Sequence, residues 1–180
     1  MAGACLGLLF GVVTVQATQG RVVPIEDLVR RADAVVHARV ESVETRLGAS
    51  GRQETRVELV SVEVWKGLAT NRVGLVLGSG VLGERWVRVV GEPEYRPGEE
   101  VVVFAVNNER GEAVTLELAQ GKFVVTRIPG KPDGWVSNGV YGAPPEATAT
   151  GVRPPHQRLI SVQQLRERVQ ESLRDTEVAP

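Results

Sequence analysis

The sequence predicts a mainly β fold: a small, partly open antiparallel barrel with a short N-terminal helix and a C-terminal helix packed on it. Valine is far more frequent than leucine, and β-branched side chains fit the pleated surface of a sheet. Short apolar runs with period-2 alternation recur between Gly- and Pro-containing turns. Two long runs each change phase midway, which requires a β-bulge. A sheet that coils in this way can close into a small barrel.

The first helix and the two long strands follow from local patterns. Residues 22–32 predict a short helix, with Pro24 in its first turn, acidic residues at its start and basic residues at its end. Residues 34–45 predict a long strand in which three alternate residues from Val36 share one face, whereas Val43 takes the other phase. The run that starts at Val57 changes phase in the same way, so it predicts the second long strand.

Five shorter strands are expected after these, at residues 72–77, 84–90, 101–106, 113–118 and 122–128. The run 101–106 is continuously apolar, which predicts a central strand that is buried on both faces. The last three strands are expected to form a meander with tight turns. Residues 129–155 are rich in Pro and Gly and predict a long irregular segment.

The C-terminal helix has a capping box. Ser161 is the expected N-cap and Gln164 lies three residues further on, while Ile160 and Leu165 occupy the hydrophobic-staple positions. Apolar residues then recur at helical spacing up to Leu173, so one face of the helix should dock on the barrel.

Residues 1–17 are predicted to be a signal peptide, and residues 18–180 a single β-barrel domain with the C-terminal helix. The first 17 residues carry no charged side chain, and the run 6–15 is apolar but too short to span a membrane. Cleavage after Ala17 would remove Cys5, the only cysteine, which suits an oxidising compartment. We therefore expect an exported protein, periplasmic or extracellular, with no stable membrane span in the mature chain.

Composition excludes several classes of function. The net charge of the 180-residue chain is −1, which argues against a nucleic-acid partner. A single cysteine excludes an internal disulfide framework and a Cys-rich zinc site. Aromatic residues are too scarce for a reader of single-stranded nucleic acid, which needs stacking platforms. No cofactor and no metal are expected.

Two motifs that resemble binding sites are interpreted as structural features. Residues 78–83 match G-x-G-x-x-G, but a strand-like run follows where a dinucleotide site needs a helix, so we expect a flexible Gly-rich connection. The acidic cluster of Glu92, Glu94, Glu99 and Glu100 predicts a solvated loop, with a weak calcium site as its alternative.

The candidate partner-binding residues are Trp135, Tyr141, Arg153 and His156, which lie in or beside the long irregular segment. Aromatic and Arg side chains on loops often anchor partners, although the two rings could instead cap an open barrel end. Trp65 and Trp86 are expected in the core or at the barrel rim. No catalytic residue is predicted. The alternative is a small secreted hydrolase that uses His37 or His156 as its general base.

Four segments carry a resemblance to a known group of proteins: residues 25–36 (I-E-D-L-V through A-D-A-V-V), 62–67 (V-E-V-W-K-G), 95–101 (Y-R-P-G-E-E-V) and 119–123 (A-Q-G-K-F). In this order they resemble poorly characterised exported bacterial proteins, and the segment found ahead of secreted matrixin-type metalloprotease domains. The plan also resembles the OB-like barrel of netrin-type and metalloprotease-inhibitor modules.

That resemblance implies an OB-like barrel but carries over no known activity. The inhibitor modules place a Cys at the mature N-terminus, where this chain would begin with Thr18, and the chain has no H-E-x-x-H motif. We therefore expect an exported, non-catalytic module that binds an envelope or extracellular protein or glycan.

Overall fold

The computed structural model describes residues 21–68, 70–130, 133–142 and 159–178, and the protein is mainly β. The predicted fold class is confirmed: an antiparallel sheet carries a short helix from the start of the chain and a longer C-terminal helix. The helices are α1 (Ile25–Arg31), the 3-10 helix η1 (Leu118–Gly121) and α2 (Val162–Val178). The strands are β1 (Ala34–Leu47), β2 (Gln53–Lys66), β3 (Arg72–Leu77), β4 (Gly80–Leu82), β5 (Arg85–Val87), β6 (Glu100–Asn107), β7 (Ala113–Thr115), β8 (Lys122–Thr126), β9 (Trp135–Ser137) and β10 (Ile160–Ser161).

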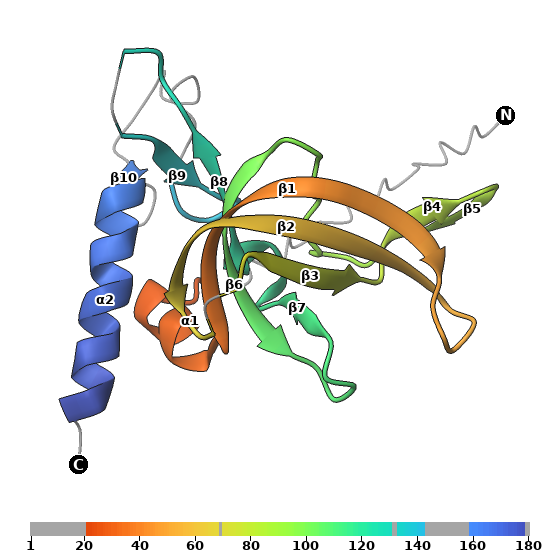
Figure 1. Ribbon diagram of the computed structural model, residues 1–180, viewed down its shortest axis with the longest axis horizontal. Helices are drawn as coiled ribbons and strands as arrows, with labels where there is room; N and C mark the ends of the chain where they lie inside the picture. The colour runs from red at the N-terminus through yellow and green to blue at the C-terminus, as the bar shows by residue number, and fades with distance from the viewer. Residues whose placement is uncertain (1–20, 69, 131–132, 143–158, 179–180) are drawn as a thin grey trace, which may run out of the picture.

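The main sheet is open. Its strands follow the order β10-β9-β8-β6-β1-β2-β3, and β7 pairs with β6 beside that path. Among the described strands, β10 and β3 at the two ends do not pair with each other, so the sheet does not close into a barrel. The strands β4 and β5 form a separate two-stranded ribbon, which we call the arm (Figure 1).

The predicted β-bulges are present in both long strands. In the β1–β2 pairing, Val40 lies opposite Leu59 and Ser42 opposite Glu58, so Glu41 has no partner of its own. This extra residue turns Val43 to the face that Val40 already occupies, which explains the phase change in the sequence. On β2 the register skips Val62 and Trp65, further along than the phase change expected between Leu59 and Val60, and Val60 and Val62 are exposed. Both strands can therefore bend while they keep one face apolar.

The middle of the sheet is buried on both faces. One core lies between the sheet and the helices and includes Val102 and Phe104 of β6. The opposite core includes Val101 and Val103 of the same strand. The prediction that this apolar run is a central strand is therefore confirmed.

The two helices pack against each other and on one face of the sheet. In α2 the predicted capping box is confirmed, because Gln164 N donates to Ser161 Oγ (3.1 Å) and Ser161 N donates to Gln164 Oε1 (2.9 Å). Leu165 has no exposed surface, so the predicted apolar face is docked. No helix in the described part of the chain is long and apolar enough to cross a membrane.

Three predicted elements differ from the structure. The helix expected at 22–32 begins only at Ile25, because Pro24 has extended backbone angles at the N-cap. The run 84–90 contains only the three residues of β5, which pair with β4. The expected meander is absent, since β7 and β8 both pair with β6, and residues between them loop out through η1.

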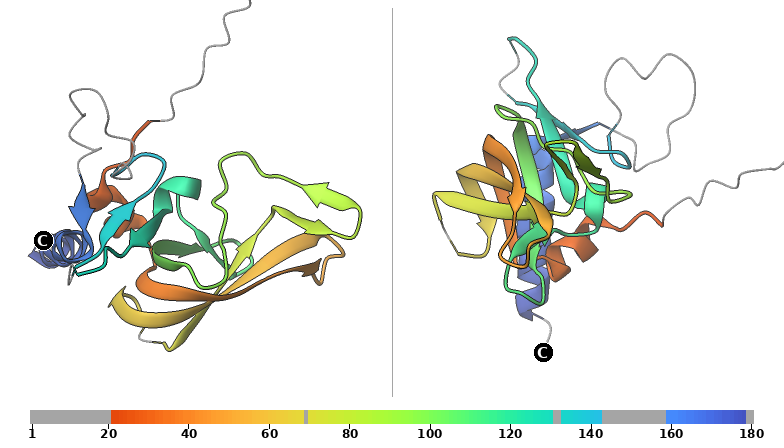
Figure 2. Two further views of the ribbon diagram at one scale, coloured as in Figure 1. Left: turned by 90° about the horizontal axis from the view of Figure 1, so that it is seen from above. Right: turned by 90° about the vertical axis from the view of Figure 1, so that its right-hand side faces the viewer.

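The helices and the arm lie at opposite ends of the molecule. α1 and α2 cover one end of the sheet, whereas the β1–β2 hairpin extends away from them and ends near the arm (Figures 1 and 2).

Candidate functional site

The structure does not bring the four predicted binding residues together as a surface. Arg153 and His156 lie outside the described residues. Trp135 is half-buried on β9. Tyr141 is 5% exposed, its hydroxyl donates to Val23 O (2.6 Å), and its ring centroid lies 5.8 Å from that of Phe123. The placement of Tyr141 on an accessible surface was therefore wrong, because its ring belongs to the helix-side core. A binding role for Trp135 stays a prediction.

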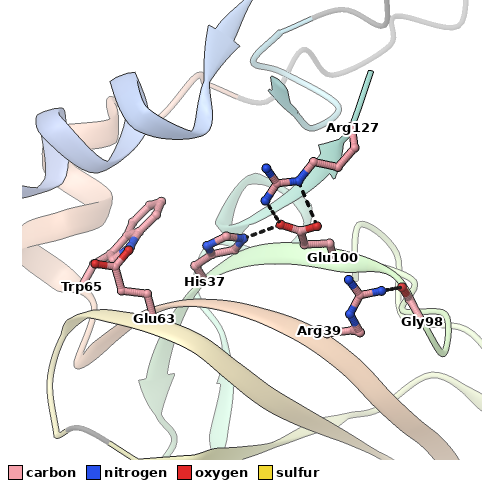
Figure 3. A network of polar contacts seen from close by, with 7 residues as sticks. All are labelled: His37, Arg39, Glu63, Trp65, Gly98, Glu100 and Arg127. Atoms are coloured by element: carbon pink, nitrogen blue, oxygen red, sulfur yellow. Dashed lines mark hydrogen bonds and ion pairs between the residues drawn. The ribbon is translucent and has the colours of Figure 1, made fainter. Parts of the chain in front are cut away.

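His37, the candidate general base, belongs to a network of polar contacts between strands (Figure 3). Its Nε2 lies 2.7 Å from Glu100 Oε1, and its ring centroid lies 5.9 Å from that of Trp65. Arg127, the residue after β8, reaches the same carboxylate and donates to it from Nε (3.2 Å) and from its terminal nitrogen. The hydrogen bond from Arg127, and to a lesser degree that with His37, lowers the pKa of Glu100.

This network connects neighbouring strands and does not have the features of an active site. Its members come from β1, from β6 and from the residue that follows β8, and these three strands are neighbours in the sheet. His37 is buried, and it lines neither of the two hollows described below. A hydrolytic site needs a base that reaches a bound substrate or water. The position of His37 gives the hydrolase alternative no support.

The acidic cluster predicted around residues 92–100 is divided among separate partners. Glu92 accepts backbone hydrogen bonds, as described below, and Glu94 lies 3.5 Å from Arg96. Glu99 pairs with the buried Lys122 at 2.6 Å, and Glu100 joins the network with His37. Among the described residues, no three His, Cys, Asp or Glu side chains are grouped so that they could hold a metal ion. Glu92, Glu99 and Glu100 instead attach the segment to its surroundings, whereas Glu94 pairs within it.

A groove lies between the arm, the far end of the β1–β2 hairpin and the segment 92–96, and we call it the arm groove. Its volume is about 350 Å³. It is lined by Val43, Thr45, Thr55, Leu77, Ser79, Gly80, residues 86–89 and residues 92–96. A second hollow of about 330 Å³ lies on the other side of Glu92 and Pro93. Both hollows therefore depend on how the segment around Glu92 is held.

Each glycine of the G-x-G-x-x-G motif lies where a larger side chain would be crowded or where the backbone has a positive φ. A Cβ at Gly80 would lie 2.2 Å from Thr55 Oγ1 and 2.6 Å from Thr45 Oγ1, so only glycine lets the arm approach the long hairpin this closely. Gly83 has φ of 59° at the first position of the two-residue turn between β4 and β5, a conformation that glycine adopts readily. A Cβ at Gly78 would lie 2.9 Å from Val89. The expected flexible connection is thus a fixed turn and ribbon.

The backbone amides of this motif do bind a carboxylate, but it belongs to the same chain. Gly78 N and Ser79 N donate to the two oxygens of Glu92 at 2.8 and 2.7 Å. Ser79 Oγ also accepts from Val89 N at 2.9 Å. Successive backbone amides of this kind form an anion site, and here the internal carboxylate fills it. The contact fixes the wall of the arm groove.

The arm exposes an apolar pair at the edge of the groove. Val81 and Trp86 lie directly opposite each other on β4 and β5, and they are 59% and 66% exposed. The expectation of a core or rim position fits Trp65, which is buried, whereas Trp86 lies on the projecting arm. The sequence signal was the short turn Gly83-Glu84 with Val81 and Trp86 two residues away on either side, and this run is too brief to show periodicity.

No protein-family model matches the chain, and none of the curated proteins or solved structures compared with it matches either. The function is therefore argued from the geometry of the chain itself.

Proposed function

We propose that this chain is an exported, non-catalytic β module that binds a protein or glycan partner at the cell envelope, and that the arm groove is its binding site. The observation that carries the proposal is the exposed Val81–Trp86 pair on a ribbon whose position is fixed by close contacts. Exposed aromatic residues beside a hollow are typical anchors of binding sites. Two large apolar side chains that are exposed next to each other are typical of a surface that contacts a partner.

The arm is held rigidly enough to present this pair in one orientation. Gln53 Nε2 donates to Gly80 O at 2.7 Å, and Thr55 Oγ1 donates to Ser79 O at 2.5 Å. Thr55 in turn lies 2.7 Å from Thr45 Oγ1. A site whose residues are fixed before binding loses less conformational entropy when the partner arrives.

The export part of the proposal rests on the sequence of residues 1–17 and on the resemblance of the four quoted segments to exported bacterial proteins. Protein recovered from a producing bacterium after fractionation should begin at Thr18, as read by mass spectrometry of its N-terminal peptide. Intact chain that starts at Met1 and stays in the cytoplasmic fraction would contradict it.

The binding part is tested by retention on isolated cell envelopes. Trp86→Ala should weaken retention about tenfold or more, the usual effect of truncating an aromatic anchor. The melting temperature should stay unchanged, because two thirds of this side chain is already in solvent. Val62→Ala, which removes an equally exposed side chain from the outer face of β2, serves as the matched control.

A third variant separates the two candidate surfaces. Trp135→Ala should leave retention near the wild-type value if the arm groove is the site. Loss of retention in Trp135→Ala, with Trp86→Ala unaffected, would move the site to β9 and overturn the proposal for the arm groove.

A further inference from the structure

We propose that the arm groove receives an extended, acidic peptide segment of a protein partner, which adds as a third strand to the free edge of β5. This inference rests on the proposed function and narrows the partner from a protein or glycan to a polypeptide in strand conformation. Three features of the arm carry it: the outer edge of β5, the apolar face, and two arginines, Arg85 and Arg88, which have no ion pair with any residue that the structure describes.

The register of the arm directs polar backbone groups outward at Trp86. Leu82 and Arg85 flank a two-residue turn and are paired, so they form the hydrogen-bonded pair next to the turn. The next pair, Val81 and Trp86, must then be the non-hydrogen-bonded kind, with N–H and C=O groups that face away from the ribbon. No strand in the described part of the chain pairs with β5 on its outer side. Trp86 therefore offers one donor and one acceptor to an added strand.

The arm has an apolar face beside its outer edge. In the part of the chain that the structure describes, β5 pairs only with β4, so its outer side can accept a further strand. The side chains of Val81 and Trp86 lie close together because they form a non-hydrogen-bonded pair. An added strand would extend this apolar face, and its alternate side chains would enter the hollow that Val87 and Val89 line.

The positive charge of the arm favours a peptide that contains acidic residues. Arg85 and Arg88 are exposed, and among the described residues neither has a carboxylate within ion-pair distance. The nearby carboxylates are otherwise engaged, since Glu92 accepts from backbone amides and Glu94 pairs with Arg96. Glu84 in the turn of the arm is a single opposing charge. Aspartate or glutamate in the peptide would complement the two arginines.

A glycan fits these features less well than a strand. A sugar ring can stack on an exposed indole, but it does not require a donor and an acceptor spaced along a free strand edge. Main-chain hydrogen bonds to an edge are specific to an extended polypeptide. The outward groups of Trp86 are therefore the observation that favours the peptide.

The test begins with a phage-displayed library of random seven-residue peptides, selected on the purified protein. Selected sequences should alternate apolar residues with Asp or Glu. Their binding should fall about tenfold or more in Trp86→Ala, as expected for an anchor residue, and should fall in Arg88→Glu. Arg174→Glu, on α2 at the far end of the molecule, and Val62→Ala are the controls and should bind as the wild type does.

Two readouts report the strand geometry itself. Methylation of alternate backbone nitrogens in a selected peptide should abolish binding, whereas methylation of the intervening nitrogens should not. Hydrogen exchange of the Trp86 amide should slow about tenfold or more when peptide binds, because the amide gains an acceptor. Selected peptides that tolerate methylation at every position, or that leave this amide unprotected, would overturn the inference.

The remaining outcomes separate this inference from the proposed function. Purified envelope polysaccharide that binds in a Trp86-dependent way, with no peptide selected over Trp86→Ala, would overturn the strand and leave the binding module standing. If neither envelopes, polysaccharide nor peptides distinguish the wild type from Trp86→Ala, both proposals are wrong.

Discussion

At the scale of single residues, the charged side chain of Lys122 has internal partners that explain its burial. Lys122 is 6% exposed, yet it reaches Glu99 Oε2 at 2.6 Å and lies 4.5 Å from the ring of Tyr95. Burial lowers the pKa of Lys122, and burial also raises the pKa of Tyr95. A buried charge is tolerated only with such partners. These residues thus fasten the segment 92–99 to β8.

Glu100 gives a prediction about pH. The hydrogen bond from Arg127 lowers its pKa below the ordinary value of 4.5, so the ionised form stabilises the fold. This contribution is complete above about pH 4.5 and is lost as the pH falls through the lower pKa of the folded state. Glu100→Gln should be less stable than the wild type at pH 7, and the gap should narrow by pH 3 in urea unfolding. A difference in the free energy of unfolding that stays constant with pH would contradict a stabilising role of ionised Glu100. Glu84→Gln, in the exposed turn, is the control.

Gly80 gives a prediction about the arm. An added Cβ would collide with the hydroxyls of Thr45 and Thr55, so Gly80→Ala should destabilise the protein by about 1–3 kcal/mol. It should also displace the arm and weaken retention on envelopes. Gly83→Asn has open space around the added side chain, and Asn tolerates a positive φ, so it should change both quantities little. Equal effects of the two variants in chemical denaturation and retention would mean that close contact at Gly80 does not position the arm.

At the scale of elements, two of the four segments quoted in the sequence analysis, 62–67 and 119–123, connect strands with helices and loops. Lys66 Nζ donates to the carbonyl oxygens of Val29 and Ala32 at 2.7 and 2.5 Å, at the C-terminus of α1. In 119–123, Gln120 accepts from Val23 N at 2.9 Å, while Lys122 donates to Glu99 of the 95–101 segment at 2.6 Å. The quoted motifs therefore account for the scaffold and contain no residue of the arm.

The docking of α2 gives the third prediction. Leu165→Ala should cost about 2–5 kcal/mol, because its side chain is fully buried in the helix-side core. Ser161→Ala should cost about 1 kcal/mol, since it removes the N-cap acceptor. Gln163→Ala on the exposed face should be near neutral. Thermal unfolding monitored by circular dichroism checks all three, and a negligible effect of Leu165→Ala would show that the helix does not need this face.

Regular elements could be predicted from the sequence, whereas the candidate site could not. Long strands and α2 repeat their periodicity often enough to reveal buried faces, and a phase change at Val43 located a bulge. The arm has strands of three residues, which is too short for a period-2 pattern to be distinctive. Tyr141 lies in a segment without periodicity, and its burial depends on Val23 and Phe123, which are distant in sequence.

At the scale of the whole molecule, the packing of the helices and the proposed binding site lie at opposite ends of the open sheet. One end is covered by α1 and α2, with apolar side chains packed on both sheet faces. The other end presents the arm, its groove and the tip of the β1–β2 hairpin (Figure 1).

Hydrogen exchange across the whole chain, with and without isolated cell envelopes, tests the central claim most directly. Bound partner should slow exchange in residues 78–96 and leave β9 and α2 at their free rates, because only the arm groove is covered. Slowed exchange confined to β9 and its neighbours, with residues 78–96 unchanged, would contradict the claim that the arm is where this protein meets its partner.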